Sequence, residues 1–305
     1  MIEINRVEFQ KPDLERLASA CTVVDMHFHS HYSDGTSSID KIAQRARQLG
    51  IGLAVTDHNE IRGALEIDSH KDLLTIPGIE ITTADGPHIL VYFYDTGELE
   101  KFYHYEIVPH MGFDVMSAVS LTVEQTVAAA RRYRCLAFGA HPFCATFTGI
   151  CNSQISPERQ RALLAAVDGV EVINASNLNK WNLKSTVLGF NLGKAMIGGS
   201  DGHSLGHMGK AVSYAACRPD RTAFLDSVRN GHNRVIGKEI PLLGKVTSNG
   251  RKLRSNISNC PDLLERNLRY GYALLHSKSR MFRENVKRKF SDRFRHQPTH
   301  DDFGL

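Results

Sequence analysis

Short apolar runs alternate with stretches of helical periodicity along most of this chain. The apolar runs predict strands at residues 22–27, 52–56, 73–76, 88–94, 135–140, 169–174, 195–199 and 211–216. Apolar residues at spacings of three and four predict helices at 38–49, 122–133, 157–166 and 219–229. Repeated strand–helix units indicate parallel strands, and about seven of them favour a closed α/β barrel over an open sheet.

Three segments depart from this pattern. Residues 1–21 mix acids and bases and are expected to form an N-terminal arm before a barrel domain at 22–240. Residues 95–121 carry aromatic and imidazole side chains without clear periodicity, which indicates a loop or a short lid over one end of the barrel. Residues 241–305 hold aromatic and aliphatic residues among many bases, and we expect a basic, helical C-terminal extension.

Charge and composition narrow the class of protein. The net charge of +4 hides an asymmetry, because residues 241–305 contain fourteen Lys and Arg against six Asp and Glu, which leaves the rest near −4. The six cysteines are scattered without a C-x-x-C pair, which argues against a zinc ribbon and indicates a reduced, cytoplasmic protein. We find no apolar run long enough to span a membrane and no signal peptide.

Histidines and acids gather near the ends of the predicted strands. His27 and His29 lie two residues apart, so in a strand their imidazoles point to the same side, and a turn can bring Asp34 back to them. The pattern recurs along the chain and gives nine candidate metal ligands: His27, His29, Asp34, His58, Glu80, His88, His141, Asp201 and His203. Because buried ionisable groups are costly unless paired or metal-bound, this recurrence predicts a metal centre.

The number of ligands predicts more than one ion. A catalytic zinc uses three protein ligands, so nine indicate two or three divalent ions, and the donor types suit zinc, manganese or iron. Two ions bridged by a carboxylate, about 3.5–4 Å apart, are typical of displacement at phosphorus, where they bind phosphoryl oxygens and hold the attacking hydroxide.

These residues also carry a resemblance. The motifs H-F-H with S-D-G-T, T-D-H, G-I-E, A-H-P and S-D-G-H, in this order between residues 22 and 238, resemble the polymerase and histidinol phosphatase (PHP) family. The resemblance implies a distorted seven-stranded TIM-like barrel with a trinuclear metal centre. It implies one metal held by His27, His29, Glu80 and Asp201, a second by Glu80, His88 and His141, and a third by Asp34, His58 and His203. His104 and His110 are rivals for the place of His88.

The expected function is hydrolysis of a small-molecule phosphomonoester, such as a nucleotide, a sugar phosphate or a histidinol-phosphate-like compound, by a metal-bridging hydroxide. The catalytic residues expected are Asp34, His58, Glu80 and His203. Lys180, Asn174 and His207 are the candidates for contacts with the substrate, since phosphate needs cationic and hydrogen-bonding donors. Asp25 and Asp57 flank candidate ligands and suit contacts that orient the imidazoles.

Other interpretations stay open. An amidohydrolase-type hydrolase also begins with H-x-H, but it usually has a carboxylated lysine in mid-chain, and none follows a strand here. The basic extension could indicate a nuclease acting on nucleic-acid ends, although a solvated helix face that packs on the barrel or a partner subunit is favoured. A homo-oligomer is left open, and a regulatory barrel without activity is disfavoured because no ligand position is missing.

Overall fold

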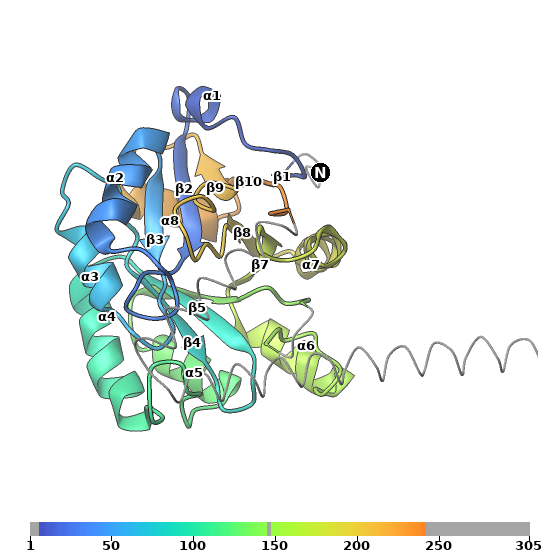
Figure 1. The fold of residues 1–305 in the computed structure, drawn as a ribbon. Coiled ribbons are helices and arrows are strands. Elements are labelled where there is room, and N and C mark those ends of the chain that lie inside the picture. The colour runs from blue at the N-terminus through green and yellow to red at the C-terminus, as the bar shows by residue number, and fades with distance from the viewer. Residues whose placement is uncertain (1–5, 145–147, 242–305) are drawn as a thin grey trace, which may run out of the picture. The chain divides into compact units, whose positions relative to one another are not determined.

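The computed structural model describes residues 6–144 and 148–241, whose strands form two five-stranded sheets (Figure 1). The first sheet has the order β1-β10-β9-β2-β3 and the second the order β4-β5-β6-β7-β8. The strands are β1 (Val7–Glu8), β2 (Thr22–Phe28), β3 (Gly52–Val55), β4 (Gly78–Thr82), β5 (His88–Phe93), β6 (Cys135–Gly139), β7 (Gly169–Asn174), β8 (Ala195–Gly199), β9 (Ala211–Ala215) and β10 (Arg234–Gly237). The predicted basic extension falls, from residue 242 on, outside the described residues.

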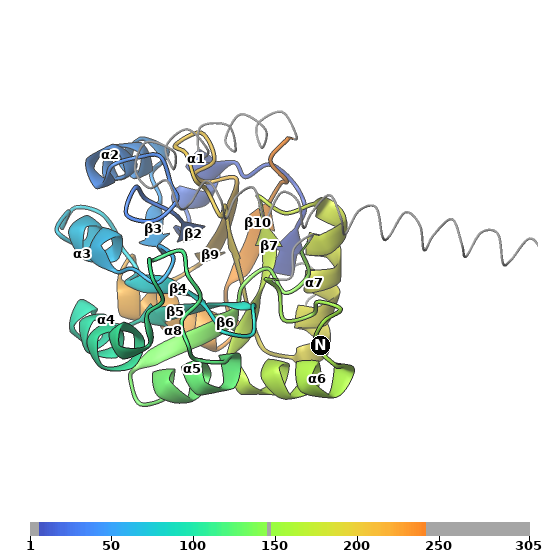
Figure 2. The same ribbon diagram turned by 60° about the horizontal axis from the view of Figure 1, so that its bottom comes forward.

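Helices surround the strands, and Figure 2 shows α2 to α7 following one another around them. The helices are α1 (Leu14–Ala18), α2 (Ile39–Leu49), α3 (Arg62–Asp68), α4 (Thr96–Phe102), the π-helical turn η2 (Tyr103–Ile107), the 3-10 turn η3 (Val108–His110), α5 (Val123–Ala130), α6 (Pro157–Ala166), α7 (Asn179–Leu192) and α8 (Arg221–Arg229). Within the described ranges, no helix has the length and apolar character needed to cross a membrane.

The two sheets meet through single bridges and not through continuous ladders. Phe28 bridges Gly202 beyond β8, and His58 bridges Glu80 of β4, both in parallel orientation. An antiparallel ladder of β9 with the first half of β2, centred on the pair Val23 and Tyr214, occupies the edge of β2 that β8 would need for full closure. The mixed α/β class is therefore confirmed, whereas the expected closed barrel is not formed by the described strands.

Most predicted elements are present, and the exceptions have local causes. The strand expected at 73–76 is wrong, because only a single bridge from Thr75 to Leu53 forms there. Pro77 lacks an N–H that could extend the ladder, and the strand resumes as β4, where Ile79 and Ile81 are buried. The segment 95–121, expected as a loop or lid, instead begins with α4, whose Leu99 and Phe102 are fully buried in the core.

Helix α7 was not predicted, because polar residues lie on its buried face and apolar residues on its exposed face. Asn182, Ser185 and Thr186 are buried, whereas Leu183 and Val187 are exposed. Helix α2, by contrast, buries an apolar stripe that starts at Ile39 and ends before the left-handed Gly50. Periodicity in hydrophobic residues reveals only helices that, like α2, bury an apolar stripe.

Candidate metal centre

The end of β2 supplies the centre of the cluster. His27 and His29 are fully buried, and their Nε2 atoms lie 3.1 Å apart. The loop after β2 returns Asp34, whose Oδ1 lies 3.5 Å from His29 Nδ1. Beyond β8, Asp201 Oδ1 lies 3.2 Å from His29 Nε2. The close approach of β8 to β2 requires Gly199, since a Cβ there would lie 2.4 Å from the Cβ of His27.

Glu80 occupies the middle of the cluster, on β4, and its two oxygens face different imidazoles. Oε2 lies 3.2–3.3 Å from nitrogens of His27, His29 and His58. Oε1 lies 3.0 Å from His88 Nδ1 and 3.3 Å from His141 Nε2. The carboxylate therefore stands between two groups of potential ligands, the position that a bridging ligand occupies.

The topology explains why distant residues meet here. Strand β5 runs antiparallel to β4 and pairs His88 with Thr82, so the first residue of β5 lies at the edge where the other strands end. His141 follows β6 and Asp201 follows β8, and both have positive φ angles, of 27° and 47°. Non-glycine residues rarely adopt such angles, and this backbone strain is typical of functional sites.

A third group lies around Asp34. Its Oδ1 is 3.1 Å from His203 Nε2, and its Oδ2 is 3.7 Å from His58 Nε2. His203 donates from Nδ1 to the carbonyl of Asp201, which leaves Nε2 as the nitrogen that faces Asp34. The structure thus brings all nine predicted ligands together, in overlapping clusters whose donor atoms lie within 4.8 Å of one another.

The sequence did not reveal Glu171, which joins several members of the cluster. This buried residue of β7 accepts from His27 Nδ1 at 3.0 Å, from the amide of His141 at 2.8 Å and from Asn174 Nδ2 at 3.0 Å. Because a carboxylate can only accept here, His27 carries a proton on Nδ1, which leaves Nε2 as the nitrogen that faces the cluster. Glu171 lies inside the apolar run of β7. An acid within a run of apolar residues was the one feature of the sequence that could have indicated its role.

Asp25 and Asp57 have a different role from the expected one. Asp25 accepts from the amides of Ser200 and Gly209, and Asp57 accepts from the amide and hydroxyl of Ser30. These carboxylates hold the loops that carry the candidate ligands, and among the described hydrogen bonds neither aspartate contacts an imidazole, whereas Glu171 does.

The buried acids and imidazoles of the cluster shift one another's pKa values. Burial opposes ionisation of Glu80 and Asp201, yet the surrounding imidazoles hold the pKa of both carboxyls well below the usual range. Burial also opposes a charge on His27, but Glu80, Glu171 and Asp201 raise its pKa well above 6.5. Burial lowers the pKa of His58 to about 3, so this imidazole stays neutral. The ionised acids need nearby positive charge, which bound cations would supply.

The donor set fits divalent transition metals. Each cluster combines imidazole nitrogens with carboxylate oxygens, the donors that zinc, manganese and iron accept. The side chains of His27, His29, Asp34 and Glu80 are at most 1% exposed, whereas those of His88, His203 and Asp201 are 12–17% exposed. The cluster therefore opens to solvent on the side of these three residues.

The other predicted residues are placed as follows. Asn174 is buried and donates to Asp201 Oδ2 at 3.2 Å, so it is directed into the cluster. Lys180, expected in a loop, is exposed in the first turn of α7. His207 is buried in the segment between β8 and β9, and its amide donates to the carbonyl of Ser204. Of the rivals to His88, His110 contacts Ser120 and His104 packs against Tyr103.

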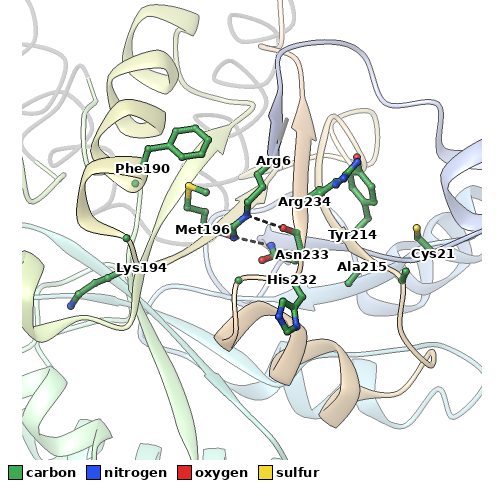
Figure 3. Close-up of a pocket in the computed structure, with 14 residues that line it drawn as sticks. Arg6, Cys21, Phe190, Lys194, Met196, Tyr214, Ala215, His232, Asn233 and Arg234 are labelled. Carbon is green, nitrogen blue, oxygen red and sulfur yellow. Dashed lines mark hydrogen bonds between the residues drawn. The ribbon is translucent and has the colours of Figure 1, made fainter. Parts of the chain in front are cut away.

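A separate cavity of about 760 Å³ lies at the N-terminal ends of β2, β8 and β10 (Figure 3). It is lined by residues that precede β2, begin β8 and begin β10, among them Cys21, Lys194 and Arg234. The candidate ligands lie at the other ends of β2 and β8, so this cavity is distinct from the metal centre.

Comparisons with known proteins agree with this geometry. Residues 25–166 match the model of the PHP domain family. Error-prone DNA polymerases of Mycobacterium bovis and Mycobacterium tuberculosis are 33% identical to this chain over an alignment of 102 positions, which covers 28% of this chain and 9% of the polymerase. This chain therefore covers only a small part of the length of those relatives.

Solved structures share the fold at low identity. The lesion-specific endonuclease PfuEndoQ from Pyrococcus furiosus superposes with a TM-score of 0.57 at 16% identity, over 70% of this chain and 57% of that one. A two-domain protein from Bacteroides vulgatus, containing a predicted PHP-like metal-dependent phosphoesterase, gives 0.53 at 19% identity, over 81% and 73%. At such identities the similarity concerns the fold alone.

Proposed function

We propose that the metal centre of this chain, whose residues 25–166 match the PHP domain family, hydrolyses phosphate esters, with a small-molecule phosphomonoester as the preferred substrate. The position of Glu80 is the observation that carries this proposal. One oxygen faces His88 and His141, and the other faces His27, His29 and His58. A carboxylate so placed would hold two cations close together, the arrangement that two-metal enzymes use for displacement at phosphorus.

We assign the ligands in three groups that share this carboxylate. His27, His29, Glu80 and Asp201 would hold one cation, Glu80, His88 and His141 a second, and Asp34, His58 and His203 a third. Bound there, divalent cations would neutralise phosphoryl oxygens and acidify a water molecule for attack. The barrel domain that carries these residues is proposed to span 22–240.

The chain's own residues prepare this site in two ways. Glu171 fixes the tautomer of His27, and Asn174 holds Asp201 from the side away from the imidazoles. The substrate would enter past His88 and His203, the more exposed imidazoles. A phosphomonoester carries about two negative charges near neutral pH, which suits a site built to concentrate cations.

An amidohydrolase would use this arrangement less well. A neutral amide gains little from several neighbouring cations, and the sequence places no lysine at the end of a mid-chain strand, where such enzymes usually carry a carboxylated one. The geometry therefore favours phosphorus over carbon as the site of attack.

Metal analysis followed by a substrate screen tests the proposal. Protein reconstituted in turn with Zn²⁺, Mn²⁺ and Fe²⁺ should bind at least two equivalents of metal. It should cleave p-nitrophenyl phosphate at least about a hundredfold better than a p-nitroanilide, which corresponds to about 2.7 kcal/mol in the barrier. Turnover of amides without turnover of phosphate esters, or fewer than one bound metal with every ion, would contradict it.

A further inference from the structure

Two lysines and one tryptophan form an exposed cluster at the start of α7, which we name the α7 platform: Lys180, Trp181 and Lys184, together with Phe143. Lys180 Nζ lies 5.0 Å and Lys184 Nζ 4.9 Å from the centroid of the Trp181 ring. Lys184 Nζ also lies 5.7 Å from the centroid of Phe143. Both lysines are exposed, and both aromatic rings are half-buried.

A hydrogen-bonded chain fixes this platform beside the metal centre. Asn182, the neighbour of Trp181, accepts from the amide of Asn174 and donates to its carbonyl at 2.8 Å. Asn174 in turn donates to Asp201, a candidate ligand. On the other side, Phe143 follows His141 by two residues, and its carbonyl accepts from Asn177 Nδ2 at 2.6 Å. The platform is therefore tied to the cluster from two directions.

Within the described residues, no close ion pair holds either lysine of the platform. Among the ion pairs of the described residues, neither Lys180 nor Lys184 has a carboxylate partner within 4.0 Å, and the nearby Glu239 accepts from the backbone amide of Asn179. A second aromatic–cation pair, that of Tyr32 and Arg62, does have a carboxylate partner. Arg62 lies over Tyr32, but it is paired with Glu60 at 2.7 Å.

We infer that the α7 platform binds single-stranded nucleic acid, with Trp181 stacking on a base while Lys180 and Lys184 contact neighbouring phosphates. Aromatic faces accept any unpaired base, and lysines that flank such a face follow the backbone, which is the usual construction of single-strand sites. The phosphates draw the ammonium groups off the indole and free its face for the base. This inference rests on the proposed phosphoesterase and adds to its small-molecule substrates the phosphate esters at the ends of single strands.

The overall charge limits how this binding works. Residues 1–240 are near −4 in sum and residues 241–305 near +8, so within residues 1–240 the attraction comes from the platform and the metal centre. Binding should therefore be short-ranged and strongly dependent on salt.

Trp181 is the only tryptophan of the chain, so its fluorescence reports directly on the platform. Full-length protein with its metals is titrated with a phosphorothioate-linked oligothymidylate of about ten nucleotides, a length within usual single-strand site sizes. We expect saturable quenching that weakens as salt rises, and at least about tenfold weaker binding of the same sequence as a duplex, because paired bases are not free to stack. Absence of quenching, or equal affinity for the duplex, would overturn the inference.

Variants separate the stacking contribution from the charges. By anisotropy of a labelled oligothymidylate, Trp181→Ala should bind about tenfold more weakly, and Trp181→Phe should recover much of the loss. The double variant Lys180→Ala/Lys184→Ala should reduce the slope of log affinity against log salt by about 1.4. The matched control Lys71→Ala/Lys101→Ala removes the same charge from ion pairs on α3 and α4 and should leave the slope unchanged.

Turnover distinguishes this inference from the function on which it rests. In Trp181→Ala, KM for an oligonucleotide with a terminal phosphate should rise about tenfold, while p-nitrophenyl phosphate is cleaved within about twofold of the parent rate. If Trp181→Ala and the double lysine variant both bind and cleave the oligonucleotide like the parent, the platform is not a nucleic-acid site. Failure of the parent to cleave any phosphate ester would contradict the proposed function instead, whatever the binding shows.

Discussion

The metal centre has two walls that are built differently. The wall formed by β2 and its following loop carries its chemistry openly, since His27, His29 and Asp34 lie within eight residues of sequence. The wall formed by β7 and α7 contributes no candidate ligand, yet Glu171, Asn174 and Asn182 hold the ligands of the first wall and of β8 in position.

The difference shows how the two kinds of residue can be recognised. Ligands must be imidazoles or carboxylates, so they stand out wherever a strand ends. Supporting residues need only one hydrogen bond of the right length, which many polar residues can make once they are buried. Experiments on each wall should therefore give effects of different size and kind.

The largest effect is expected from Glu80→Gln, in the middle of the cluster. The amide keeps the shape but loses the charge that would hold two cations, so activity should fall by more than about a hundredfold, beyond the loss usual for a supporting residue. The far-UV circular dichroism should stay that of the parent. Glu98→Gln, at a partly exposed position of α4 where the side chain pairs with Lys101, is the control and should leave activity unchanged. Activity of Glu80→Gln within tenfold of the parent would contradict the bridging role.

The position of Glu80 also shows which features of the site could be predicted from the sequence and which could not. Its membership in the cluster was predicted from G-I-E, although the strand that carries it was not, because Pro77 separates the predicted strand from β4. The nine candidate ligands could be chosen because the sequence gives the chemistry of each side chain directly. The way the two sheets meet could not be predicted. It depends on the ladder between β9 and β2, which pairs residues nearly two hundred positions apart.

Metal removal should have the next largest effect, on stability. The carboxylates of Glu80 and Asp201 are ionised and buried or nearly so, and loss of the cations leaves their charges uncompensated. With metal at about a hundredfold over its Kd, binding contributes about 2.7 kcal/mol, so a chelator should lower Tm by about 5–10 °C. Calorimetry with and without chelator measures this, and re-addition of metal should restore Tm. An unchanged Tm would mean that the cluster holds no metal in the folded protein.

The second wall should respond more mildly, as Glu171→Gln would show. The amide can still accept a hydrogen bond from His27 Nδ1, but it lacks the charge that favours this tautomer and raises the basicity of the ring. We expect metal affinity to fall about tenfold to a hundredfold while the ligands remain. Titration with a metal indicator gives the affinity. A loss as complete as that of Glu80→Gln would make Glu171 a ligand and not a support.

The smallest effects distinguish the two faces of α7. Asn182→Leu removes both hydrogen bonds to the backbone of Asn174, and the strand end keeps buried polar groups without these partners, so unfolding should become easier by about 1–3 kcal/mol. Leu183→Lys, on the adjacent position that is 56% exposed, should change stability by no more than about 0.5 kcal/mol. Urea unfolding of both variants measures the contrast. Hydrophobic periodicity alone would predict the reverse order, with leucine inside and asparagine outside. If Leu183→Lys proves the more destabilising change, α7 packs by its apolar residues, and the hydrogen-bonded chain that joins the α7 platform to Asp201 does not form.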